Sequence, residues 1–224
     1  MTVRSVPLGD LCEVTPSPSS DLFTDLMAGA DGTPVVTPAD ITDAQKIDTQ
    51  AIRCLRGKPA GLERYRLRPR DLVIVRLGGV GRLALLDERA RDWVYHSSCI
   101  RVRPNTRRVD PVYLAAYLAY SPAADELLSH TQVGTVPVLA TRALETLPVA
   151  LPSAREQRRM SAALSEVALQ MDLHFQMLDR LDSVRQGLFA RILGDDFPGA
   201  GVSRPTGSVS DSRTPRTRRT NRMS

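Results

Sequence analysis

The chain has 224 residues, of which 42% are hydrophobic and 25% are charged, and its net charge is +5. This composition is typical of a folded protein, no apolar run approaches the roughly 20 residues that cross a bilayer, and the first ten residues lack the apolar core of a signal peptide. Three widely spaced cysteines (Cys12, Cys54, Cys99) fit neither a disulfide framework nor a metal site, so we expect reduced, buried thiols in a cytoplasmic protein without a membrane partner.

Short strands dominate the first two thirds of the chain. The apolar, β-branched run Leu72–Arg76 is followed by glycines at 78–81 and by the returning segment Arg82–Leu86, which predicts a β-hairpin. Cys99–Arg103 alternates apolar and basic residues, as expected of a strand with one face in solvent.

Helix signals interrupt these strands. Asp110 and Pro111 are a cap and a first helical residue, and Ser121-Pro122 begins a second short helix. The apolar strand Leu147–Leu151 then leads into a turn marked by proline. Residues 1–152 are therefore predicted to form one mixed, strand-rich domain.

Residues 153–194 predict one long helix. Ser153 and Glu156 have the spacing of a capping box, and at about 1.5 Å per residue the helix would span roughly 60 Å. Apolar residues recur with the 4-3-4-3 rhythm of a coiled-coil seam, so we expect dimerisation through Leu164, Val167, Met171, Leu178, Leu181, Leu188 and Ile192. Residues 195–224 are rich in Pro, Ser, Thr, Arg and Gly and are predicted to be a disordered, Arg-rich tail. The predicted fold class is α+β: a strand-rich domain, one coiled-coil helix and this tail.

Catalytic patterns are weak or missing. Residues 110–113 resemble the Asp-Pro-Pro-Tyr loop of amino-group methyltransferases, but no apolar strand precedes them, and a helix start explains them fully. The glycines at 78–81 lack the spacing of a phosphate-binding loop, and neither Lys46 nor Lys58 has a carboxylate two residues before it, as common nucleases require. The three histidines are far apart in the sequence. We predict no catalytic residue, no metal and no cofactor.

The order of the motifs is more informative than any one of them. The chain resembles the specificity (S) subunits of type I restriction-modification systems, and in particular their target-recognition domain. The resemblance rests on the segments 6–11, 37–41, 67–76, 78–81, 111–118, 134–136 with Leu139, 147–152 with 156–157, 185–189 and 193–194. The resemblance implies a non-catalytic subunit that reads double-stranded DNA and directs methyltransferase subunits, and through them restriction subunits, to a bipartite target.

A typical S subunit has two recognition domains and two long helices, whereas this sequence shows one of each and no internal repeat. The chain therefore looks like a half-subunit, which we expect to pair with an identical chain or with another half-subunit. A homodimer predicts a symmetric, interrupted target with inverted half-sites.

The DNA-binding residues are predicted from residue type and position. Four arginines lie next to turns or on the alternating strand, and two residues lie in a glycine-containing loop: Arg76, Arg82, Arg101, Arg103, Gln132 and Thr135. The segments 15–33 and 43–66 remain alternative locations for the residues that contact bases.

Two other interpretations stay open. The chain could be an orphan or truncated S fragment without a working complex, or a coiled-coil scaffold that does not read DNA. Copurification with a methyltransferase subunit and binding to random-sequence DNA separate these interpretations.

Overall fold

The computed structural model describes residues 3–28, 31–57, 61–129, 131 and 137–193. The chain divides into two units, Met1–Asp172 and Leu173–Ser224. The predicted tail, residues 195–224, lies outside the described residues, and so do Gln132 and Thr135. No helix among the described residues is long and apolar enough to cross a membrane.

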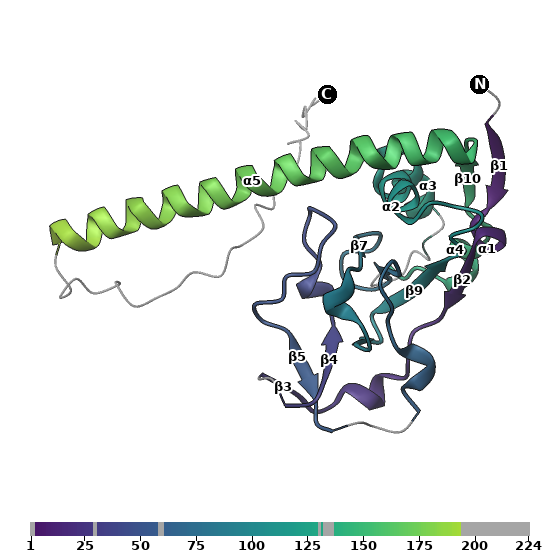
Figure 1. The fold of residues 1–224 in the computed structure, drawn as a ribbon. Coiled ribbons are helices and arrows are strands. Elements are labelled where there is room, and N and C mark those ends of the chain that lie inside the picture. The colour runs from purple at the N-terminus through teal and green to yellow at the C-terminus, as the bar shows by residue number, and fades with distance from the viewer. Residues whose placement is uncertain (1–2, 29–30, 58–60, 130, 132–136, 194–224) are drawn as a thin grey trace, which may run out of the picture. The chain divides into compact units, whose positions relative to one another are not determined.

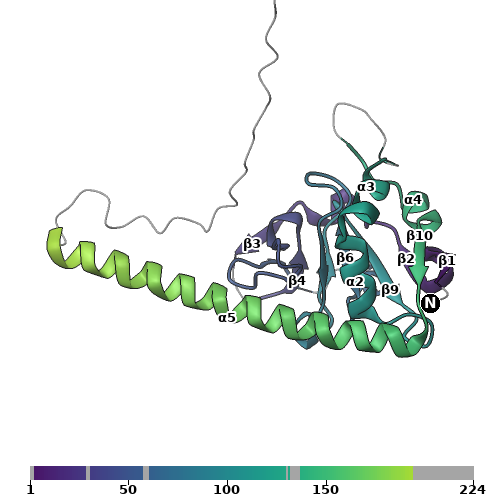
Figure 2. The same ribbon diagram turned by 90° about the horizontal axis from the view of Figure 1, so that it is seen from above.

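A four-stranded antiparallel sheet is the centre of the first unit (Figures 1 and 2). Its strand order is β2 (Cys12–Thr15), β9 (Cys99–Pro104), β6 (Leu72–Val75) and β7 (Leu83–Leu85). The predicted hairpin is confirmed, since Leu72 pairs with Leu85 and Ile74 with Leu83. Gly78 and Gly79 adopt φ values of 74° and 95° in its turn, which residues with a Cβ rarely adopt.

Two further sheets complete the strands. One has the order β3 (Leu26–Ala28), β5 (Arg53–Leu55), β4 (Thr33–Val36) and β8 (Val94–Tyr95), and its β4–β8 pair is parallel. The other pairs β1 (Arg4–Pro7) with β10 (Pro148–Leu151), so that the two ends of the domain are joined.

Short helices connect the strands. The α-helices of the first unit that precede the long helix are α1 (Leu8–Leu11), α2 (Pro111–Ala119), α3 (Ser121–Ser129) and α4 (Thr141–Thr146). Four 3-10 turns lie at Ser20–Phe23, Pro38–Asp40, Glu63–Tyr65 and Glu88–Ala90. The predicted start of α2 is confirmed, because the Asp110 carboxylate accepts hydrogen bonds from the backbone N–H groups of Val112 (2.9 Å) and Tyr113 (3.2 Å).

The central sheet is covered on both faces. Successive side chains of a strand point to opposite faces, and on β9 Ile100 and Val102 pack into a first core with Leu114 and Leu118 of α2. Cys99 belongs to a second core, which includes Val73 and Tyr95. β9 therefore has no face in solvent, and the prediction of one wet face is wrong.

Helix α5 (Ala154–Leu193) begins with the predicted capping box. The Ser153 N–H donates to the Glu156 carboxylate at 3.1 Å, and the Glu156 N–H donates to Ser153 Oγ at 3.3 Å. Further along the helix, the Gln157 side chain accepts from the Asp110 N–H at 2.9 Å, and Ser161 Oγ donates to the Asp110 carboxylate at 2.6 Å. These contacts hold the first two turns of α5 against the start of α2.

Candidate nucleic-acid interface

Two of the predicted arginines lie at one end of the central sheet. β6 ends at Val75, which pairs with Cys99 at the start of β9, and β7 begins at Leu83 on the other side of β6. Because neighbouring strands are antiparallel, the residues just beyond these ends lie at the same edge. This edge, which we call the Arg76 edge, carries Arg76, Arg82 and the segment 96–98.

Arg76 is held mainly through its backbone. Its N–H donates to the Ser98 carbonyl at 2.8 Å, and its carbonyl accepts from the Leu139 N–H at 3.0 Å. The half-buried side chain makes one long hydrogen bond, from Nη1 to Ser17 Oγ at 3.4 Å, and its buried Nε has no partner among the described residues. No carboxylate among the described residues pairs with this guanidinium, so its charge remains available to an anionic partner.

Arg82 lies on the other side of the hairpin turn. Its guanidinium donates to the Ile41 carbonyl and lies 3.9 Å from the Asp43 carboxylate, with 42% of the side chain exposed. Arg82 also lines a hollow with Thr42, Gln45 and Leu128. An exposed arginine beside a hollow can reach a phosphate or a base edge.

Arg101 has a different environment from the one its sequence context predicts. It extends from β9 into the domain, where only 3% of its side chain is exposed. Its guanidinium donates to the carbonyls of Arg64 and Arg66 at 2.9 and 3.0 Å, and also to Glu13 and Thr15 at 2.7 and 2.6 Å. The structure thus places Arg101 in the domain interior, and its geometry gives no support to the expected DNA contact.

Arg103 is similarly committed to a protein partner. Its Nε and Nη2 bind the two oxygens of Asp71 at 2.7 and 2.8 Å, and the Asp71 side chain is 1% exposed. The hydrogen bonds to this carboxylate raise the pKa of Arg103 above its ordinary value. Such a bidentate pair fixes the guanidinium, so Arg103 holds the Asp71 loop against β9 instead of offering a free charge.

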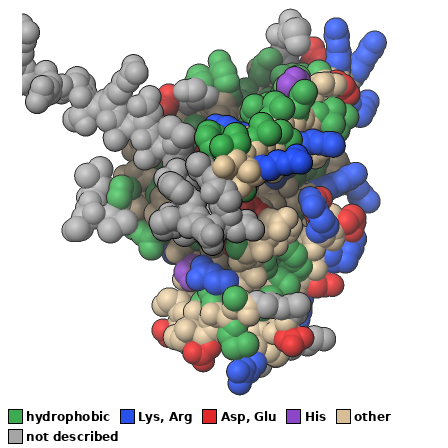
Figure 3. Space-filling model, turned by 90° about the vertical axis from the view of Figure 1, so that its left-hand side faces the viewer, with side chains coloured by type: hydrophobic (Ala, Val, Ile, Leu, Met, Phe, Trp, Pro, Cys, Tyr) green, Lys and Arg blue, Asp and Glu red, His purple; other side chains and the backbone are tan. Residues whose placement is uncertain are grey.

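His96 and Arg53 lie near each other, since Arg53 pairs with Val35 on β4 and the His96 N–H donates to the next residue, Val36. His96 was not predicted from the sequence, whereas Arg53 falls in segment 43–66, an alternative location for base contacts. His96 is half-buried between β8 and β9, and Arg53 is exposed on β5. A short His-Ser-Ser segment before a strand was the available signal for His96, but no pattern connected it with Arg53. Figure 3 shows basic side chains at several separate positions on one face instead of a single patch.

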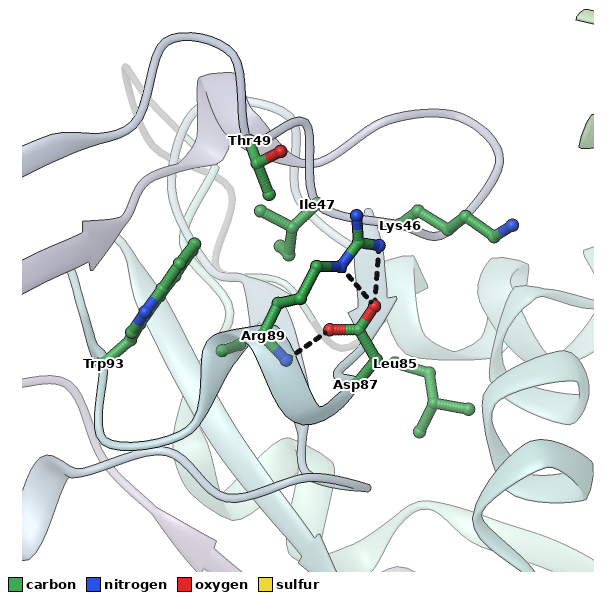
Figure 4. A pocket seen from close by; sticks show the side chains of 8 residues that line it. Lys46, Ile47, Thr49, Leu85, Asp87, Arg89 and Trp93 are labelled. Atoms are coloured by element: carbon green, nitrogen blue, oxygen red, sulfur yellow. Dashed lines mark hydrogen bonds and ion pairs between the residues drawn. The ribbon is translucent and has the colours of Figure 1, made fainter. Parts of the chain in front are cut away.

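A second hollow contains the only tryptophan of the chain. Trp93, Ile47, Leu85 and Ala90 line it together with Lys46, Thr49, Asp87 and Arg89 (Figure 4). Its two cations are both paired: Arg89 Nη2 binds Asp87 at 2.7 Å, and Lys46 binds Asp172 on α5. Because both cations of this hollow already have carboxylate partners, it offers less to DNA than the Arg76 edge does.

The three cysteines are buried thiols. Cys12, Cys54 and Cys99 are free, as expected, and burial raises the pKa of Cys12 and of Cys99 to about 12. Among the described residues, no group of three or more His, Cys, Asp or Glu side chains is placed to hold a metal ion.

The expected dimerisation residues are nearly all exposed. Leu164 is half-buried, whereas large parts of the other side chains lie open: Val167 55%, Met171 47%, Leu178 60%, Leu181 56%, Leu188 56% and Ile192 76%. The seam therefore begins at the half-buried Leu164 and continues as a stripe of exposed apolar side chains.

Comparisons with known proteins agree on one family. Residues 2–182 match the family model described as type I restriction modification DNA specificity domain. No match was found among curated proteins.

Three solved structures share the fold. One was reported for the complex assembly and conformational transition of a type I restriction-modification system. It is 22% identical with a TM-score of 0.58, and the match covers 88% of this chain and 46% of that chain. The HsdS subunit from Thermoanaerobacter tengcongensis is 23% identical with a TM-score of 0.54, covering 88% of this chain and 45% of that chain. The S subunit from M. genitalium is 14% identical with a TM-score of 0.56, covering 83% and 44%. The chain thus spans less than half the length of each.

Proposed function

The chain belongs to the family of type I restriction-modification DNA specificity domains, and we propose that it is the subunit that selects the DNA sequence. In this role it binds double-stranded DNA, performs no catalysis itself and directs methyltransferase subunits, and through them restriction subunits, to a bipartite target. The match over residues 2–182 carries the proposal, because it covers the strand-rich domain and most of α5.

The Arg76 edge supports a DNA contact. Arg76 and Arg82 flank one glycine turn, and neither has a close carboxylate partner among the described residues, since Arg82 and Asp43 remain 3.9 Å apart. Guanidinium groups suit both guanine edges and phosphates. Arg76 and Arg82 therefore stay in the proposed interface, and Gln132 and Thr135 stay in it on the sequence pattern alone. Arg101 and Arg103 shape the domain that presents this interface.

The open stripe of α5 supports pairing with a second helix. Met171, Leu178 and Leu181 repeat at the a and d positions of a heptad, and each is about half exposed. Apolar side chains at this spacing interlock with the same positions of a facing helix. The proposed partner is an identical chain or another chain of the same half-subunit type, which supplies the second recognition domain.

A two-helix coiled coil still leaves part of α5 uncovered. If Leu178 is at position a, then Leu169 and Leu173 fall at outer positions f and c, and they are 53% and 51% exposed. Phe175 and Met177, at the flanking positions e and g, are 50% and 63% exposed. A helix that is apolar on so many sides is usually covered on those sides, and we assign this outer surface to the methyltransferase subunits.

Purification with its methyltransferase subunit and selection from a random-sequence duplex pool test this function. We expect one complex that enriches a bipartite motif with identical, inverted half-sites, and a methylation map from cells carrying the system with the same motif. Enrichment without copurification would favour an orphan fragment, and copurification without enrichment of any sequence would favour a scaffold. Light scattering that shows a monomer at all concentrations would exclude the homodimer.

A further inference from the structure

His96 lies in a tight connection at the Arg76 edge. Its backbone N–H donates to the Val36 carbonyl at 2.8 Å, and its carbonyl accepts from the Cys99 N–H at 2.9 Å. The backbone of His96 is therefore fixed on both sides, by β4 and by the start of β9.

The imidazole ring is fixed as well. Its Nδ1 accepts a hydrogen bond from the Ser98 N–H at 3.1 Å and lies 3.2 Å from Ser98 Oγ. The ring packs against the buried Phe23, with centroids 5.0 Å apart and an angle of 52° between the planes. Two contacts of different kinds thus hold one orientation of the ring.

This arrangement selects a protonation state. Because Nδ1 accepts from a backbone N–H, the neutral ring carries its proton on Nε2. Burial lowers the pKa of His96, and the nearby Arg53 lowers it further. Nε2 therefore presents an N–H donor, on the side of the ring opposite Ser98, and no hydrogen bond to it is found among the described residues.

Ser98 connects His96 with Arg76. The Ser98 N–H holds the imidazole, and the Ser98 carbonyl accepts from the Arg76 N–H at 2.8 Å. One residue thus positions two donors at the same edge. Arg53 is exposed on β5 and pairs with Val35, next to the Val36 carbonyl that accepts from the His96 N–H. This neighbouring cation lowers the pKa of His96.

We propose that His96 is a DNA-contacting residue, which donates Nε2–H to an acceptor atom of the target while Arg53 neutralises an adjacent phosphate. The acceptor is an N7 or O6 atom of a purine edge or a phosphate oxygen, which share the same chemistry of recognition. A rigid, neutral donor suits direct readout, because it costs little entropy to place and attracts no phosphate by charge alone. This inference rests on the proposed function.

Two substitutions test the roles of Nδ1 and Nε2 separately. In His96→Asn the amide oxygen can replace Nδ1 as the acceptor for the Ser98 N–H, but no group replaces Nε2. In His96→Gln the longer amide can place an N–H near Nε2 and loses the acceptor close to the backbone. Both variants, with Arg53→Gln, are assembled as full chains with the methyltransferase subunit, and Arg91→Gln is the control, since Arg91 is exposed and paired with Glu88.

Selection from the random-sequence duplex pool is the measurement, with the melting temperature of each variant as a check of folding. We expect His96→Asn to fold and to bind the wild-type motif on the order of tenfold more weakly, with His96→Gln between it and the wild type. Relaxation of the motif at one position identifies a base contact, and uniformly weaker binding with an unchanged motif identifies a phosphate contact. Arg53→Gln should weaken binding and reduce its salt dependence, and Arg91→Gln should change neither.

Wild-type affinity and an unchanged motif in a folded His96→Asn complex would overturn the inference and leave the proposed function intact. If His96→Asn does not fold, Arg53→Gln decides, and wild-type affinity with an unchanged salt dependence in that folded complex overturns the inference. Wild-type binding by His96→Gln agrees with the inference, because its amide can replace the Nε2 donor. A wild-type complex that enriches no sequence removes the proposed function, and the inference with it.

Discussion

The recognition domain and the distal part of α5 differ in how far their side chains are buried. Within the domain, large apolar residues such as Leu72 and Ile100 are fully buried, and even Arg101 and Asp71 are enclosed and paired. Along Leu173–Leu193, Leu178 and Phe189 are 60% and 56% exposed. The domain is complete as a folding unit, whereas the helix lacks the contacts that its apolar residues require.

Charged residues show the same difference. In the domain, Arg103 holds Asp71 across 32 positions of the sequence. On the helix, Arg185 pairs with Asp182 one turn away, and such local pairs contribute only a few tenths of a kcal/mol to helix stability. The domain is stabilised by contacts between distant segments, and in the proposed dimer the distal helix obtains comparable contacts from another chain.

The largest expected effect comes from a charge in the seam. Leu178→Asp removes an apolar contact worth about 1.5–3 kcal/mol from each copy of a dimer, so the dissociation constant should rise by about two to four powers of ten. Sedimentation equilibrium measures this change, and the melting temperature of the domain should stay the same, because Leu178 lies in the second unit.

Gln176→Asp is the matched control for the seam, since it places the same residue type at outer position f of the same helix. It should leave the dissociation constant within about twofold of the wild type. Equal weakening by both variants would mean that Asp destabilises the helix itself, and the contrast between an open seam and a complete domain would then lose its main support.

The next largest effect is expected inside the domain. Arg103→Ala leaves the buried Asp71 carboxylate without its bidentate partner, and breaking such a pair costs about 3–5 kcal/mol of unfolding free energy. Urea denaturation measures the loss. Arg76→Gln is the comparison, because this side chain makes one long hydrogen bond at 3.4 Å and should change DNA binding more than stability. A stable Arg103→Ala variant with weakened DNA binding would restore the DNA role expected from the sequence.

The sequence predicted the elements that depend on local signals. The glycines of the 78–81 turn, the Asp110 cap and the Ser153–Glu156 capping box each involve residues close together in the chain, and all three are confirmed. The 4-3-4-3 rhythm of α5 is equally local, and the structure has one continuous helix from Ala154 to Leu193.

These local signals could not predict contacts between segments that are distant in the sequence. Cys99–Arg103 has the alternation of a strand with one face in solvent, but β9 lies between β2 and β6, and the carbonyls that enclose Arg101 come from Arg64 and Arg66. His96 was missed for the same reason, since Phe23 and Arg53 reach it from segments that are distant in the sequence. Only the sheet order brings these residues together.

The smallest expected effect lies at the start of α5, which belongs to the first unit. Ser153→Ala removes the side-chain acceptor for the Glu156 N–H, and losing such a cap costs about 1 kcal/mol. Ser165→Ala, at an exposed position within the helix, is the control and should be neutral or slightly stabilising. Hydrogen bonds from Ser153 lower the pKa of Glu156, so the carboxylate contribution is present above the ordinary pKa of Glu and is lost as the pH falls through the lowered value. The stability difference between the wild type and Ser153→Ala, followed by thermal unfolding, should therefore shrink on acidification. A difference independent of pH would show that Glu156 does not share in the cap, and that the start of α5 is held by the contacts of Gln157 and Ser161 with Asp110.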